Sequence, residues 1–159
     1  MKVERRVEAA LPDADGVYFN HPGVAVVTWD ATIRAVHIEW QGWADSTEFV
    51  ALNEAGLRAL MEHHGSRFLS DSRKMKVVRQ SDQDWLSGDL FPRALAAGLR
   101  RVALIVPKSA LAMTNVDRIA DSVPATQLAV AYFATVEEAR EWLAGPPVAS
   151  FHGRQGNSI

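Results

Sequence analysis

The sequence predicts an α/β protein with a mixed, roughly five-stranded sheet that opens with an antiparallel hairpin and is covered by helices. Short segments with the patterns of strands alternate along most of the chain with segments that have the period of helices. This alternation predicts parallel strands joined by right-handed crossovers. Near the start, two strand patterns follow each other with only a short connection, which predicts the antiparallel hairpin.

The hairpin is predicted from two neighbouring segments. Val24–Trp29 is an apolar run rich in β-branched residues. Val36, Ile38 and Trp40 alternate with polar residues, which is the period of a half-buried strand. The connection at Asp30–Arg34 is short enough to join two antiparallel strands.

The first helix is predicted over Ser46–His64, where one face is apolar. Asp45 or Ser46 can cap its start, and Gly65 can end it. A glycine within a helix costs about 1 kcal/mol relative to alanine, so we explain Gly56 by a close approach of the helix to the sheet. The residues on this face are Phe49, Leu52, Gly56, Leu60 and His63.

After a short strand at Arg67–Asp71, the sequence predicts two short helices. Ser81 caps the first of them. Asp89 caps the second, because Pro92 then lies in the first helical turn, where backbone donors have no partner within the helix. Gly98 ends the second helix.

The remaining elements alternate in the same way. Val102–Val106 is a continuous apolar run, which is typical of a strand buried on both faces near the centre of a sheet. A weaker helical pattern lies around Asn115–Asp121, and a strand pattern lies at Leu128–Phe133. Thr135 and Glu138 form a capping box that begins the last helix.

A chain of 159 residues fits one domain, which we assign to residues 17–144. Residues 1–16 are interpreted as a loose lead-in, and residues 145–159, which begin Gly-Pro-Pro, as a flexible tail. The sequence has no cysteine, which excludes disulfides, thiolate zinc sites and cysteine nucleophiles.

Charge and hydropathy exclude further classes of function. The formal net charge of −2, from 17 basic and 19 acidic residues, argues against non-specific nucleic-acid binding, which needs a basic face. No apolar run approaches the about 18 residues of a membrane span. Met1–Asp15 lacks the apolar segment of a signal peptide, so we expect a cytoplasmic location.

Little in the sequence points to catalysis. It has no nucleophile elbow, phosphate-binding loop, dinucleotide-binding motif or H-E-x-x-H motif. His63 and His64 are adjacent, so on a helix they point about 100° apart and are poorly placed to share a metal ion. We therefore predict a protein that is not an enzyme and uses no cofactor or metal. An enzyme site assembled from residues distant in sequence stays open.

The first candidate site is the segment that leaves the end of the strand at Arg67–Asp71. In α/β sheets, the carboxyl ends of parallel strands are where ligands and partners usually bind. The segment is either a partner-binding or regulatory loop, or a solvated loop with local turns. Its residues are Ser70, Asp71, Ser72, Arg73, Lys74 and Met75, and the loop continues to Lys76.

The second candidate site involves two tryptophans. Trp43 and Trp85 lie beside polar residues, in a turn-like segment and near the start of a helix respectively. They either border an apolar ligand pocket or pack at the rim of the core, as aromatic side chains usually do.

A combination of short patterns resembles one family, the SpoIIAA-like or STAS/SEC14-like family of small bacterial proteins. The resemblance extends over about residues 17–143. The patterns are Tyr18-Phe19-Asn20-His21-Pro22-Gly23, Leu69-x-Asp71-x-Arg73-Lys74-Met75, Asp82-Gln83-x-Trp85, Phe91-Pro92-Arg93, Ala97-Gly98-Leu99 and Phe133-x-x-x-Glu137-Glu138-Ala139-x-x-Trp142-Leu143.

The resemblance implies a fold akin to that of anti-sigma-factor antagonists and a role in binding partner proteins. It also implies that a serine in the loop after a central strand can act as a phosphorylation switch. Ser70 or Ser72 occupies a comparable place here, although the Asp-Ser-Ser-Gly run of those antagonists is absent. The SEC14-like side of the resemblance implies an apolar pocket.

We therefore predict a non-catalytic, STAS-like regulatory or protein-interaction domain, with Ser72 as the most switchable residue of its loop. The alternative is a small apolar-ligand or lipid-binding protein of SEC14-like type. The identity of the partner or ligand and the presence of a homodimer stay open.

Overall fold

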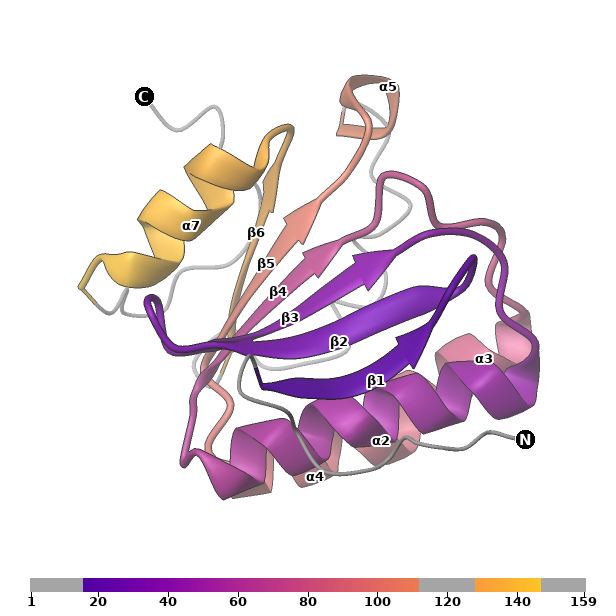
Figure 1. Cartoon of the computed structure of the whole chain (residues 1–159), viewed down its shortest axis with the longest axis horizontal. Coiled ribbons are helices and arrows are strands. Elements are labelled where there is room, and N and C mark those ends of the chain that lie inside the picture. The colour runs from indigo at the N-terminus through magenta and orange to yellow at the C-terminus, as the bar shows by residue number, and fades with distance from the viewer. Residues whose placement is uncertain (1–15, 112–127, 147–159) are drawn as a thin grey trace.

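Six strands form one sheet in the part of the chain that the structure describes, residues 16–111 and 128–146 of a computed structural model (Figure 1). They lie in chain order, so each strand pairs with the one before it. β1 to β3 are antiparallel and β3 to β6 are parallel, which confirms the predicted mixed sheet with an antiparallel start. The strands are β1 Val17–His21, β2 Ala25–Asp30, β3 Ala35–Trp40, β4 Arg67–Asp71, β5 Arg101–Ile105 and β6 Ala129–Phe133.

β1 is an additional strand at the edge of the sheet that the pattern of the sequence does not reveal. Its register against β2 shifts between Val17 and Phe19, so the alternation of a regular strand is interrupted. Its last residues, Asn20 and His21, are polar and exposed. The predicted hairpin of β2 and β3 is therefore preceded by a second antiparallel hairpin, whose turn contains Gly23 with a φ of 84°.

The helices cover both faces of the sheet (Figure 1). α2 lies against β1, β2 and β3, and α4 packs beside it on the same face. α7 lies on the opposite face, against β4, β5 and β6. The helices are α2 Ser46–Glu62, α3 Gln80–Trp85, η1 Leu86–Leu90, α4 Phe91–Ala97, α5 Lys108–Leu111 and α7 Val136–Ala144.

The ends of α2 follow from its sequence. The Asp45 side chain accepts a hydrogen bond from the Glu48 backbone, and the Glu48 side chain accepts one from the Asp45 backbone. This capping box confirms the predicted start. At the other end, the Gly65 backbone N–H donates to the carbonyl of Leu60 at 2.8 Å. A Cβ atom on Gly65 would lie only 2.8 Å from the Trp29 ring, so a larger residue would displace that ring.

The predicted break at Asp89 is wrong, because Gln80–Ala97 is one continuous helical segment. Its middle part, η1, is a π turn, and the flanking residues keep helical dihedral angles, so Asp89 caps no helix. Pro92 lies in the first turn of α4, where the wider π turn before it accommodates a residue without a backbone donor. The segment begins at Gln80, so Ser81 is its second residue and not its cap.

Other predicted elements have mixed outcomes. Gly98 ends α4 with a φ of 120°, as expected from its sequence. The Thr135 side chain caps α7 by accepting a hydrogen bond from the Glu138 backbone at 3.2 Å. The helix predicted at Asn115–Asp121, all of the lead-in except Gly16, and most of the tail lie outside the described residues.

An apolar layer lies on each face of the sheet. The layer under α7 is thin, because β3, β5 and β6 contribute the alanines 35, 103 and 131, which let the helix approach closely. The other members of that layer are Ile33, Leu69, Ile105, Phe133, Ala139 and Leu143. The layer under α2 and α4 is thicker and contains the largest buried side chains, among them Tyr18, Trp29, Trp40, Phe49, Phe68 and Tyr132.

Gly56 marks the place where α2 approaches the sheet. A Cβ atom at this position would lie 3.5 Å from both Phe68 Cζ and Val36 Cγ1, which is ordinary van der Waals contact. The helix therefore does lie close to the sheet here, as expected, but the space still admits a methyl group.

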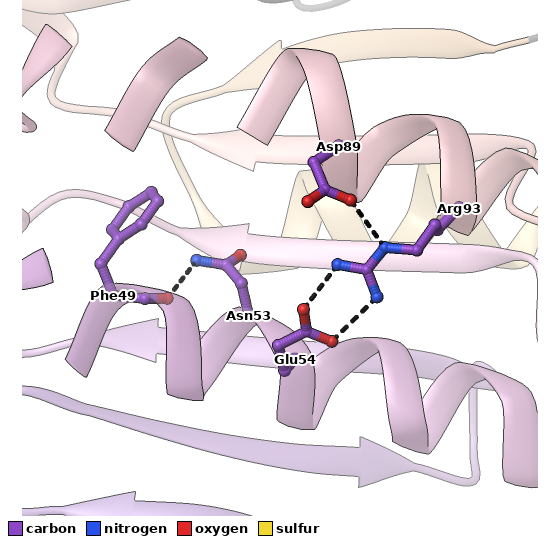
Figure 2. A network of polar contacts seen from close by, with 5 residues as sticks. All are labelled: Phe49, Asn53, Glu54, Asp89 and Arg93. Carbon is purple, nitrogen blue, oxygen red and sulfur yellow. Dashed lines mark hydrogen bonds and ion pairs between the residues drawn. The ribbon is translucent and has the colours of Figure 1, made fainter. Parts of the chain in front are cut away.

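Arg93 joins α4 to α2 by a polar network at the surface (Figure 2). Its guanidinium donates to both carboxylate oxygens of Glu54, at 3.0 and 2.5 Å, and to Asp89 Oδ1 at 2.9 Å. These hydrogen bonds raise the pKa of Arg93, so it stays charged. The bidentate geometry fixes the relative position of the two helices more than it adds stability, because all three side chains are substantially exposed.

Arg101 attaches α7 to the sheet. Its side chain is buried at the start of β5, and its guanidinium donates to the carbonyls of Trp142, Leu143 and Gly145 at 2.9 to 3.0 Å. A fourth hydrogen bond, of 3.3 Å, reaches the carbonyl of Pro146. A helix leaves its last carbonyls without donors inside it, and of the four only the Trp142 carbonyl is seen to accept a backbone hydrogen bond among the described residues, a long one of 3.3 Å from Gly145 N–H. Arg101 is thus a cap supplied by a neighbouring strand.

Candidate functional site

The candidate site is the loop of residues 72–79, which leaves the carboxyl end of β4 and leads to α3. β4 lies between β3 and β5, so the loop starts from the interior of the sheet. The Ser72 backbone N–H donates to the carbonyl of Ile105 at 2.8 Å, which extends the pairing with β5 by one residue. The base of the loop is therefore held by the sheet.

Asp71 and Arg73 form an internal ion pair at the base of the loop. Arg73 Nε and Nη2 donate to the two carboxylate oxygens of Asp71 at 2.9 and 2.7 Å. Burial raises the pKa of the Asp71 carboxyl, but the hydrogen bonds and charge of Arg73 outweigh it and lower the pKa below its usual value. Arg73 therefore braces the loop and is not a free cation.

Ser70, near the end of β4, and Ser72 and Met75 in the loop are turned partly away from solvent. The two serine hydroxyls lie 3.1 Å apart, and both residues are partly buried. The Met75 backbone N–H donates to the carbonyl of Ser72, and its side chain packs against the core. These residues give the loop a defined conformation.

Lys74 and Lys76 lie on the outer side of the loop and are exposed. Among the described residues, neither has a carboxylate within ion-pair distance. Val77 follows them and is 84 % exposed, although it is apolar. The outer side of the loop therefore presents positive charge beside an exposed aliphatic side chain.

The structure separates the two candidate tryptophans. Trp43 lies on the connection between β3 and α2 and is 49 % exposed, with the Arg79 guanidinium 5.0 Å above its ring. Trp85, at the end of α3, is partly buried and meets the ring of Phe49 edge to face. Trp43 thus belongs to the same surface as the loop, whereas Trp85 packs against the core beneath it.

His37 lies near the loop and belongs to none of the motifs considered for catalysis or metal binding. It lies on β3 on the face that carries α7, and its Nε2 is buried without a hydrogen-bond partner among the described residues. Burial lowers the pKa of His37, against the nearby charges of Glu39 and Asp71, which raise it. In the sequence His37 alternates with the apolar Val36 and Ile38, a pattern that also fits a strand with one solvated face.

Two classes of site have no support in the described part of the chain. No group of at least three histidine or acidic side chains there is arranged to hold a metal ion. No helix among residues 16–111 and 128–146 has the length and hydropathy of a membrane span.

The mixed sheet, the helices on both of its faces and the loop at the end of a central strand define a STAS-type α/β domain. The sequence matches the SpoIIAA-like family over residues 35–144, from the first residue of β3 to the last of α7. This is more than half of the chain, and the protein belongs to the SpoIIAA-like family. No curated protein and no solved structure matches it.

Proposed function

We propose that the protein is a non-catalytic protein-interaction domain with a regulatory role, and that the loop Ser70–Lys76 contacts its partner. Membership in the SpoIIAA-like family supports a STAS-type interaction domain. The observation that carries the proposal is the pair Lys74 and Lys76, which are exposed on a braced loop and have no ion-pair partner within residues 16–111 and 128–146. Such charges steer an acidic partner and fix the register in which it binds.

The experiment is a comparison of partner capture by the full chain and by the variant Lys74→Gln/Lys76→Gln. Exposed ion pairs contribute up to about 1 kcal/mol each, so losing two of them weakens binding about tenfold at low salt. Proteins from a lysate are captured on each immobilised chain and identified by mass spectrometry. The affinity of each purified candidate is then measured by calorimetry at two salt concentrations.

The matched control is Met61→Glu/Ala96→Glu, which also lowers the net charge by two, at exposed positions on α2 and α4. Both positions lie near the helix ends that precede β4 and β5, and therefore away from the loop. The proposal predicts that this control retains the partner. If the glutamine variant binds the partner as tightly as the unchanged chain does, or if the control loses as much binding as the glutamine variant, the proposal is contradicted.

Ser72 is the residue of this loop at which we propose regulation. A phosphate there adds a charge of about −1.5 to −2 next to Asp71, where it competes for Arg73. Because Asp71 is buried and held by Arg73, the competition would loosen the base of the loop. Ser72→Asp is expected to weaken partner binding and Ser72→Ala to retain it, and calorimetry with the purified partner tests both.

The SEC14-like alternative predicts that Trp43 and Trp85 border one apolar cavity. An organic extract of the purified protein, analysed by mass spectrometry, tests it. A stoichiometric lipid that disappears in Trp85→Ala would favour the alternative, and an empty extract would favour the interaction domain.

A further inference from the structure

The loop shares its surface with exposed apolar side chains. The described residues contain three exposed large apolar side chains, Trp43, Met61 and Val77. Met61 lies alone in the last turn of α2, whereas the other two flank Arg79. Arg79 is two residues after Val77, and its guanidinium covers one side of the Trp43 ring. The two apolar groups therefore belong to one surface.

This surface is held in place before any partner binds. Arg79 Nη1 donates to Ser46 Oγ at 3.3 Å, and Ser46 Oγ donates to Asp82 Oδ2 at 3.1 Å. Asp82 is buried, so this network connects the start of α2 with the start of α3 through a fixed point. An ordered surface loses less conformational entropy on binding than a loose one does.

Val77 is exposed because the residues near it in the chain are held against the core. Met75 and Val78 both pack against the core, and the Val78 carbonyl accepts a hydrogen bond of 2.9 Å from the Gln83 side chain. Because the side chains of Met75 and Val78 face the core, the side chain of Val77 between them in the chain is directed outward. An apolar side chain that the fold holds 84 % exposed gains from contact with a partner.

The charge of the surface contrasts with that of the whole chain. Residues 72–79 include cations and no acidic residue, although the chain has a net charge of −2. Arg73 is neutralised by Asp71, so the exposed cations next to the apolar groups are Lys76, which precedes Val77, and Arg79, which lies over Trp43. Tryptophan and arginine are the residues that most often supply the binding energy of protein interfaces, and here Arg79 stacks on Trp43.

We propose that this surface binds an acidic protein segment that carries one large apolar side chain, which packs between Trp43 and Val77. The inference rests on the proposed function and specifies its partner. The acidic groups of the segment pair with Lys74, Lys76 and the outer edge of Arg79. An anionic membrane is a weaker candidate, since membrane attraction usually takes a cluster of about four to eight basic residues.

The experiment uses the full chain, labelled with ¹⁵N, and synthetic peptides. The probe is a short peptide of glutamate and serine with one central phenylalanine. One matched peptide has alanine in place of phenylalanine, and another has glutamine in place of glutamate. Amide and indole chemical shifts locate binding, and calorimetry measures affinity. The proposal predicts that each replacement in the peptide weakens binding about tenfold or more.

Variants of the protein test the same surface, with the peptide left unchanged. Trp43→Ala and Val77→Ser are both expected to lower the affinity for the phenylalanine peptide, the first by about tenfold or more. Met61→Ser removes the third exposed apolar side chain and is expected to leave the affinity unchanged. Far-UV circular dichroism of each variant excludes unfolding as the cause of any loss.

Equal affinity for the glutamate and glutamine peptides, or equal losses in Met61→Ser and Trp43→Ala, would overturn the proposal. Binding to phosphatidylserine vesicles that depends on Trp43 and Lys76, without peptide binding, would assign the surface to a membrane instead and overturn it too. If a captured cellular partner depends on Lys74 and Lys76 while no peptide binds, this inference fails and the proposed function stands.

Discussion

Replacing Arg101 by methionine is expected to cost about 3–4 kcal/mol of unfolding free energy. Methionine keeps much of the side-chain volume but removes the donors for four carbonyls at the end of α7. Three of these hydrogen bonds have good lengths, and a hydrogen bond to a charged group contributes at least about 1.5 kcal/mol. From that sum of about 4.5 kcal/mol we subtract about 1 kcal/mol, because the variant no longer buries a cation.

Urea unfolding followed by far-UV circular dichroism measures this loss. Arg100→Met is the matched control, because Arg100 is exposed and, in the part of the chain that the structure describes, its guanidinium bonds only to the nearby carbonyls of Leu95 and Leu99. It is expected to cost under about 1 kcal/mol. Hydrogen exchange should quicken in α7 of the Arg101 variant before it does in α2. If Arg101→Met unfolds at the same urea concentration as Arg100→Met, the carbonyl cap does not stabilise the fold.

Three further predictions concern the core and the site. Gly56→Ala is expected to raise the unfolding free energy by about 1 kcal/mol, since a methyl group fits there, and a lower urea midpoint would show that the helix cannot tolerate it. Folding lowers the pKa of Asp71, so ionised Asp71 contributes to the unfolding free energy. This contribution is fully present above the pKa of about 3.9 in the unfolded chain, and it is lost as the pH falls through the lower pKa of the folded protein. Unfolding curves between neutral and acid pH should therefore show less acid destabilisation in Asp71→Asn than in the parent, and identical pH profiles would refute this. Burial and then Glu62 raise the pKa of Tyr18 to about 12, so stability falls as pH rises from about 10 to 12, and the ultraviolet phenolate titration near 12 should disappear in Tyr18→Phe.

Local patterns in the sequence predicted the parts of the fold that depend on local physics. Val102–Val106 is predicted as a buried strand near the centre of the sheet from its continuous apolar run; β5 is paired on both sides, but it lies beside the edge strand β6 and not at the centre. The capping residues of α2 and α7 are likewise predicted, because a cap is an interaction between residues three positions apart. The cap predicted at Asp89 is wrong, since a side chain that can cap a helix also fits within a π turn.

The candidate site was only partly predictable, because its character depends on contacts between distant segments. The sequence located the loop and Trp43, but not the stacking of Arg79 on that ring. It also presented Arg73 and Lys74 as equivalent cations. Only the folded geometry separates a cation that neutralises the buried Asp71 from one that faces solvent.

The strand order has a consequence for how the protein forms during synthesis. Each strand from β2 to β6 finds its pairing edge on a strand that has already left the ribosome, since no strand inserts between two earlier ones. The antiparallel pairs β1/β2 and β2/β3 also have the shortest connections between paired strands. Closing these loops costs the least entropy, so these strands are the least costly nucleus for folding. Growth by one strand at a time adds every new strand at the same edge of the sheet, opposite β1, and α7, which covers the last three strands, is the final described helix to be added.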